Sequence, residues 1–94
     1  MKIKIPDDVM FRILGDEAVI LNLASGVYFG LDTVGTRMWQ LMSEHGSTDK
    51  VVEMLLSEYE VEEVQLRDDL EKLIEQLSEK GLVKTDAQET SPVS

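Results

Sequence analysis

The chain is 94 residues long, acidic and free of cysteine, and these properties exclude several classes of protein. A chain of this length builds one hydrophobic core, so we expect a single domain. The absence of cysteine excludes disulfide bridges and thiolate metal sites, and the formal charge of -10 repels nucleic-acid phosphates and anionic lipid head groups.

The apolar segments of the chain are all short. None reaches the roughly 18 residues that a membrane span needs, and the first residues lack the apolar segment of a secretory signal. We therefore expect a cytoplasmic protein that does not contact a membrane. The acidic surface would speed association with a basic partner, although acidity is also an ordinary means of staying soluble.

Three apolar segments in the first third of the chain predict a meander of antiparallel strands. In residues 9–14 the side chains of Val9, Phe11 and Ile13 alternate with those of Met10 and Arg12, and the turn residues Gly15-Asp16 lead into a second strand over residues 17–23. A second turn at Ser25-Gly26, where glycine accepts a positive φ, leads into a third strand over residues 27–31. Consecutive strands usually pair, so the first and third would form the edges of the sheet.

The remaining segments predict three helices and two chain ends. The first helix begins at Asp32 or Thr33 and ends at His45-Gly46, and the second begins at Ser47 or Thr48. The third opens at Glu62-Glu63 and closes at Lys80-Gly81. For residues 2–6 a short strand and a frayed end both remain open, and residues 84–94 are expected to form a disordered polar tail. The order of elements predicts an α+β domain whose helices cover one face of the sheet.

Helical spacing predicts which side chains face the core. In the first helix we expect one buried stripe, with Trp39 on its flank and partly exposed. In the third helix we expect a narrow seam of leucines bordered by Ile74 on one side and by Asp69 and Gln76 on the other. The predicted inward residues are Val34, Met38, Leu41 and Met42, then Val51, Val52, Leu55, Leu56 and Tyr59, then Leu66, Leu70, Leu73 and Leu77.

No group of residues in the sequence predicts catalysis. The carboxylates are scattered over the exposed sides of helices, where they would be solvated and would not converge in a cleft. His45 is the only histidine and lies at a predicted helix end. The glycines form no phosphate-binding loop and the serines no nucleophile elbow. We therefore expect a protein that is not an enzyme and that uses neither a metal nor another cofactor.

The third predicted strand is unusual because neither Lys nor Pro protects it. Val27, Phe29 and Leu31 share one face of this strand, and Tyr28 and Gly30 share the other. One interpretation is that the third helix or the N-terminal segment covers its edge. The other is that a guest peptide adds to the edge as a further strand. An edge of this kind can also pair with its own copy, which would give a homodimer.

Apolar motifs follow one another in a fixed order over residues 9–83. They comprise Ala18 through Asp32, then Val34-Gly35, then Met38 through Met42, then Asp69-Leu70 through Leu77, and finally Lys80 through Val83. Taken together, these motifs resemble the PqqD-like family of precursor-peptide recognition proteins. The individual motifs are apolar and unspecific, and it is the ordered set that carries the resemblance.

The resemblance implies a winged-helix-like domain over residues 1–83, with three antiparallel strands followed by three helices. It also implies a function, which is to bind the leader segment of a ribosomally synthesised precursor peptide (RiPP). In the family, the leader adds as a strand against the third strand and lies in a groove bordered by the third helix. The implied peptide-binding residues are Val27, Tyr28, Phe29, Gly30 and Leu31 in the strand, and Leu66, Arg67, Asp69, Leu70, Leu73, Ile74 and Leu77 in the helix.

The resemblance further implies an adaptor that presents the leader to a modifying enzyme. This enzyme would be a lasso-peptide leader protease, which we prefer, or a radical SAM enzyme. The acidic surface is compatible with a leader that contains Lys or Arg. The alternative function is nucleic-acid binding by a winged helix. The net charge opposes that alternative, as does a third helix whose only cations are Arg67, Lys72 and Lys80.

Overall fold

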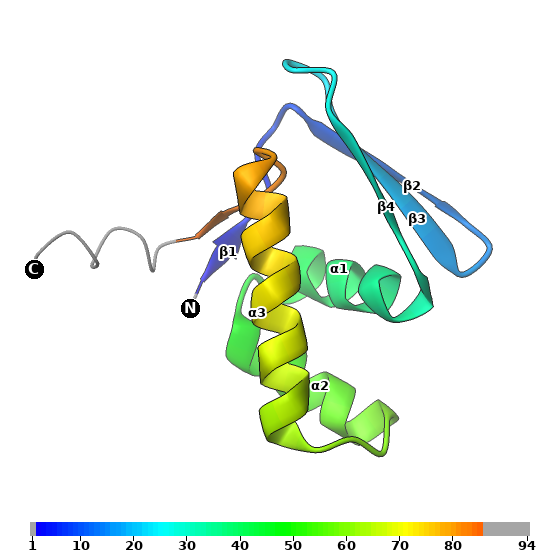
Figure 1. Cartoon of the computed structure of the whole chain (residues 1–94), viewed down its shortest axis with the longest axis vertical. Helices are drawn as coiled ribbons and strands as arrows, with labels where there is room; N and C mark the ends of the chain where they lie inside the picture. The colour runs from blue at the N-terminus through cyan, green and yellow to red at the C-terminus, as the bar shows by residue number, and fades with distance from the viewer. Residues whose placement is uncertain (1, 86–94) are drawn as a thin grey trace, which may run out of the picture.

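The core of the fold is a three-stranded antiparallel sheet. In the computed structural model, which describes residues 2–85, this sheet consists of β2 (Val9–Leu14), β3 (Glu17–Asn22) and β4 (Tyr28–Leu31) in the order β2-β3-β4 (Figure 1). Leu14 pairs with Glu17 across the first turn, and Leu21 pairs with Tyr28 near the second. The predicted meander and its two edge strands are confirmed.

Three helices follow the sheet, as predicted: α1 (Thr33–His45), α2 (Thr48–Glu58) and α3 (Glu63–Glu79). The Asp32 carboxylate caps α1 by accepting a hydrogen bond from the Gly35 N–H at 2.8 Å. Gly46 ends α1 with a φ of 65°, a conformation that glycine adopts without strain. The domain is therefore an α+β, winged-helix-like fold with all three helices after the sheet.

A second, smaller sheet joins the two ends of the described chain. Its strands are β1 (Ile3–Lys4) and β5 (Lys84–Thr85), which pair antiparallel. Ile3 is buried, and its N–H donates to the Gly46 carbonyl at 2.9 Å. The prediction of a disordered tail was therefore wrong for its first two residues, because they pair with the N-terminal strand. The rest of that predicted tail, residues 86–94, lies outside the described residues.

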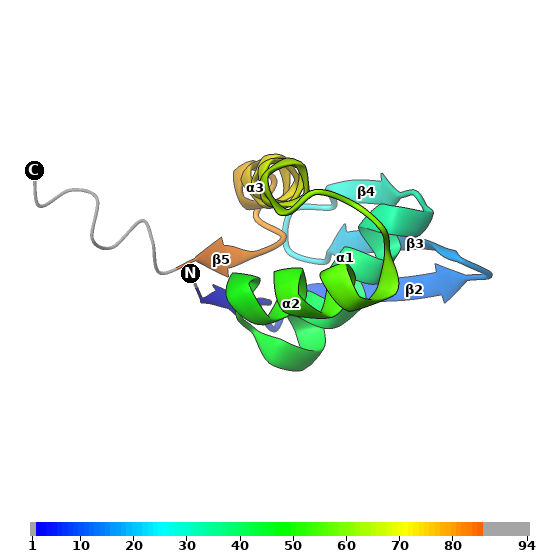
Figure 2. The same ribbon diagram turned by 90° about the horizontal axis from the view of Figure 1, so that it is seen from below.

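The helices pack on one side of the sheet and on each other. α1 contacts β3 and β4 on one side and α2 on another, and α2 in turn contacts α3. Figures 1 and 2 together place α3 next to β4, with α1 behind both. No helix within residues 2–85 is long and apolar enough to cross a bilayer.

Three predicted side-chain positions in the first two helices were wrong. Trp39 is fully buried and packs edge-on against Phe11, with ring centroids 5.6 Å apart, whereas Val34 is 44% exposed. Because α1 packs against both the sheet and α2, its buried arc is wide and lies closer to Trp39 than to Val34. Tyr59 is exposed because it is the C-cap of α2, with an extended backbone (φ -126°, ψ 147°), so helical spacing does not apply to it.

An ion pair joins α1 to the end of α2. Arg37 donates to both carboxylate oxygens of Glu58, from Nε at 2.8 Å and from Nη2 at 2.6 Å. The hydrogen bond from Arg37 lowers the pKa of Glu58 below its ordinary value. Both side chains are about one-third exposed, so the pair aligns the two helices more than it stabilises the fold.

Candidate functional site

Within residues 2–85, the backbone of β4 carries hydrogen-bonding groups along its outer edge that pair with no other strand. The Asn22 N–H donates to the Val27 carbonyl, and the Leu23 N–H donates to the Asp8 carbonyl, each at 2.8 Å. Backbone bonding alternates along an antiparallel pair, so Phe29 and Leu31 direct their N–H and C=O groups toward β3. By the same alternation, Tyr28 and Gly30 direct theirs away from the sheet. The edge of β4 therefore offers two donors and two acceptors to another strand.

The side chains of β4 divide between the two faces of the sheet. Phe29 is half-buried and Leu31 is buried on the inner face, which the helices cover. Tyr28 is 71% exposed on the outer face, and Gly30 adds no side chain there. Val27 precedes the observed strand, but its carbonyl continues the pairing with Asn22. A strand added to β4 would thus meet an apolar inner face and an open outer face.

The sheet has a second open edge, along β2. The same alternation directs the backbone groups of Phe11 and Ile13 away from β3. Both side chains are more than one-third exposed, at 43% and 37%. The two edges differ in their surroundings, because β4 lies next to α3 in both views of the ribbon, whereas β2 lies on the far side of the sheet (Figures 1 and 2).

The predicted helical wall is largely part of the core. Within α3 the buried residues are Leu66, Leu70, Ile74 and Leu77. The predicted seam was wrong at one point, because Ile74 belongs to it and Leu73 is only partly buried on its flank. Because α2 packs against α3, the buried face of α3 extends to Ile74. Leu73 remains available at the border between core and surface.

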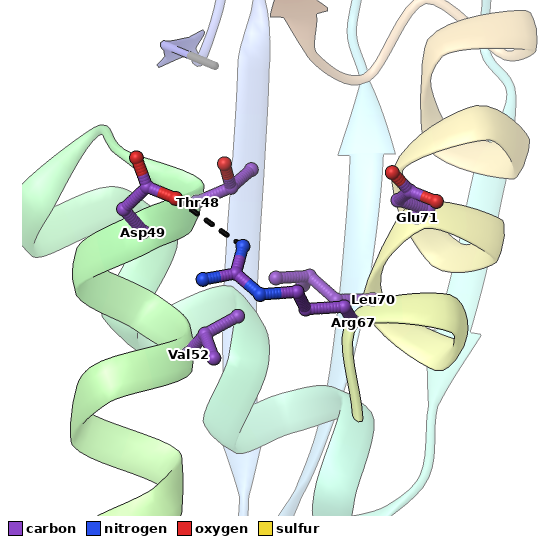
Figure 3. Close-up of a pocket in the computed structure, with 6 residues that line it drawn as sticks. All are labelled: Thr48, Asp49, Val52, Arg67, Leu70 and Glu71. Carbon is purple, nitrogen blue, oxygen red and sulfur yellow. Dashed lines mark hydrogen bonds and ion pairs between the residues drawn. The ribbon is translucent and has the colours of Figure 1, made fainter. Parts of the chain in front are cut away.

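Arg67, one of the predicted site residues, is turned toward α2. Its side chain forms an ion pair with Asp49 at 3.2 Å, the dashed line in Figure 3, and a second ion pair with Glu63 at 2.9 Å. The hydrogen bonds from Arg67 to Glu63 and, to a smaller extent, to Asp49 raise the pKa of the guanidinium above its ordinary value. Arg67 lines a cavity of about 220 Å³ between α2 and α3, together with Thr48, Asp49, Val52, Leu70 and Glu71.

One residue on the flank of α3 next to β4 was not among the predicted site residues. Lys80, the C-cap of α3, places its Nζ 5.9 Å from the centroid of the Phe29 ring. The sequence assigned Lys80 only to the end of the helix, because its aromatic partner lies 51 residues earlier. A hydrogen bond of 2.9 Å from the Asn22 side chain to the Gly81 carbonyl joins the same two regions.

Helical geometry shows which other residues share this flank. At 100° per residue, Leu66, Asp69, Leu73 and Gln76 lie within about 40° of Lys80, whereas Arg67 lies about 140° away. Leu66 is buried, whereas Asp69 is exposed and accepts a hydrogen bond from the Gln65 side chain at 2.9 Å. Of the predicted helical residues that are not buried, Asp69 and Leu73 are therefore on the side of β4, and Arg67 is not.

These features define a winged-helix-like domain with an open strand edge beside its longest helix. Residues 17–83 match the family model described as Coenzyme PQQ synthesis protein D (PqqD). The chain therefore belongs to the PqqD family. Among curated proteins, no relative matches the chain.

Two solved structures are similar to the chain over nearly its whole length. The first, described as "TbiB1 in Complex with the TbiA(beta) Leader Peptide", is 37% identical and has a TM-score of 0.82, covering 86% of this chain and 94% of that one. The second, described as "Lasso peptide synthetase B1 complexed with the leader peptide", is 25% identical and has a TM-score of 0.79, covering 90% of this chain and 100% of that one. Both are complexes of a protein of this fold with a leader peptide.

Proposed function

We propose that this protein is a non-catalytic adaptor that binds the leader segment of a ribosomally synthesised precursor peptide. The leader adds as a strand to the edge of β4, and its inward side chains pack against Phe29 and the adjacent flank of α3. The adaptor presents the leader to a modifying enzyme. The observation that carries this proposal is that the N–H and C=O groups of both Tyr28 and Gly30 face outward from the sheet.

Membership of the PqqD family and likeness to two leader-peptide complexes support the proposal. The second complex is described as a lasso peptide synthetase B1, and this description favours a lasso-peptide leader protease over a radical SAM enzyme as the partner. Of the twelve residues that the sequence proposed for the site, we retain the five of the strand together with Asp69 and Leu73. The buried residues of α3 pack in the core beneath this surface.

The charges of α3 disfavour the alternative function, binding of nucleic acid. A recognition helix needs cations that are free to contact phosphates. Arg67 is paired with Asp49 and Glu63, and the Lys72 Nζ lies 3.0 Å from the Asp68 carboxylate. Because carboxylates pair with two of the three cations of this helix region and the chain carries a charge of -10, attraction of α3 to DNA is disfavoured.

A direct titration tests the proposed function. Fluorescently labelled TbiA(beta) leader peptide should bind the purified protein with saturable polarisation, and a scrambled peptide of the same composition should not. Binding of both peptides alike, or of neither, would contradict leader recognition. Adding duplex DNA at physiological salt should leave the peptide signal unchanged.

Charge reversal at Asp69 should weaken the binding of a leader that contains lysine by about fivefold at low salt. The effect should appear mainly in the association rate, measured by stopped-flow mixing, and should shrink as salt is added. Glu75→Lys is the matched control, because Glu75 is exposed, lies about 120° around α3 from Asp69, and gives the same change in net charge. An equal effect of both variants would show that only the net charge matters.

A further inference from the structure

A hollow on the outer face of the sheet lies beside the open edge of β4. We define the outer face as the face away from the helices. Val19 and Gly30 pair directly across β3 and β4, and both belong to this face. The hollow has a volume of about 350 Å³ and is lined by Leu14, Glu17, Ala18, Val19, Gly30, Leu31 and Asp32.

The hollow exists because residue 30 is a glycine. A Cβ atom built on Gly30 meets no atom of residues 2–85 within 4 Å apart from its own chain neighbours, so the space above the backbone is open. The backbone of Gly30 is not in the left-handed region that only glycine enters easily, since the glycines with positive φ are Gly15, Gly26, Gly46 and Gly81. Neither backbone strain nor close packing within residues 2–85 therefore requires glycine here. What a glycine provides at this position is room for a side chain from elsewhere.

The walls of the hollow are apolar and its rim is acidic. Val19 and Leu14 are 42% and 63% exposed and form an apolar surface on the outer face. Glu17 lies two residues before Val19 and Asp32 two residues after Gly30, so both belong to the same face, and both are exposed. One oxygen of Asp32 caps α1, and within residues 2–85 Glu17 forms no ion pair. An aliphatic stem with a cationic end matches this combination.

Arg12 is a cation on the same face of the sheet. It lies in β2 and pairs with Val19 of β3, and Val19 in turn pairs with Gly30 of β4. Two strand spacings of about 4.8 Å each therefore separate the backbone of Arg12 from that of Gly30. Arg12 does not line the hollow. The charged side chains that line the hollow are therefore the carboxylates of Glu17 and Asp32.

We propose that the hollow at Gly30 is a subsite for a lysine or arginine side chain of the bound leader. This inference rests on the proposed function, because the leader residue beside Gly30 is the one whose side chain would reach the hollow. Its stem lies over Gly30 and contacts Val19, and its cationic end approaches Glu17 and Asp32. Gly30 and Glu17 thereby determine specificity at one position of the leader.

The test is a substitution scan of the leader against matched protein variants. The probe is the TbiA(beta) leader peptide, synthesised in sets that carry Lys, Leu or Glu at each position in turn. One position should favour Lys over Glu by about tenfold in affinity, with Leu between them. Glu17→Gln should reduce that preference to about threefold. Glu75→Gln, which makes the same change in charge on the far side of α3, should leave it unchanged.

Gly30→Val should abolish the preference at this position and leave the preferences at all other positions intact. Gly30→Ala should have an intermediate effect. Neither variant should lower the urea midpoint of unfolding, because a Cβ here meets no atom and valine favours a strand. A preference for Leu over Lys, or a scan that Gly30→Val does not change, would overturn the subsite while leaving leader binding intact. Failure of every peptide to bind would overturn the proposed function and the subsite with it.

Discussion

Replacement of Tyr28 by proline is expected to abolish leader binding, with a loss of affinity of at least a hundredfold. The Tyr28 N–H points away from β3, so proline at this position removes a donor from the open edge without breaking a bond of the β3–β4 ladder. Proline is tolerated on edge strands for the same reason. The variant should keep its circular dichroism spectrum and lose the polarisation signal of the labelled TbiA(beta) leader peptide.

Three matched variants separate the backbone effect from other causes. Tyr28→Ala retains the N–H and should bind with an affinity within about tenfold of the original, since only side-chain contacts are lost. Phe29→Pro should damage the fold itself, because the Phe29 N–H belongs to the ladder with Ile20. Ile13→Pro removes an outward donor from the β2 edge and should leave binding unchanged. If Tyr28→Pro binds normally or if Ile13→Pro abolishes binding, the leader does not add to β4.

The largest effect on stability is expected for Trp39→Ala. Trp39 is fully buried in α1 and contacts Phe11 of the sheet, so its truncation leaves a cavity where the sheet meets the helices. Truncations of this kind cost about 3–5 kcal/mol, a large part of the roughly 5–15 kcal/mol that stabilises a typical domain. We expect the melting temperature to fall by at least about 15 °C, measured by thermal denaturation.

Trp39→Phe provides the control for this prediction. Phenylalanine keeps an aromatic ring against Phe11 and removes the indole N–H, which is buried and makes no hydrogen bond within residues 2–85. Loss of an unsatisfied donor offsets part of the lost volume, so the free energy of unfolding should change by less than about 1.5 kcal/mol. A melting temperature for Trp39→Ala equal to that of Trp39→Phe would show that the ring does not support the core.

The features of the fold that depend on neighbouring residues could be predicted from the sequence. Gly15 and Gly26 identify the two turns of the meander, and Asp32 and Gly46 identify the ends of the first helix. These signals are local, because a cap or a turn is formed by residues within a few positions of each other. The open edge of β4 followed from the order of the strands and from the absence of Lys and Pro in it.

The features that depend on distant partners could not be predicted. β1 and β5 are two-residue strands at opposite ends of the described chain, and their pairing depends on how the helices bring those ends together. The orientation of Leu73 and Arg67 depends on α2, which packs on one flank of α3. Helical spacing predicts how wide a buried stripe is. It does not predict which flank of that stripe becomes buried when a second helix packs beside it.

Hydrogen exchange at the amides of β4 tests strand addition most directly. In the free protein the Tyr28 and Gly30 amides should exchange rapidly, and saturation with the TbiA(beta) leader peptide should slow both by at least about a hundredfold. The Phe29 amide should be protected with and without peptide, and those of Phe11 and Ile13 should not change. A bound leader that leaves Tyr28 and Gly30 in rapid exchange, or protects Phe11 and Ile13 instead, would contradict the proposed mode of binding.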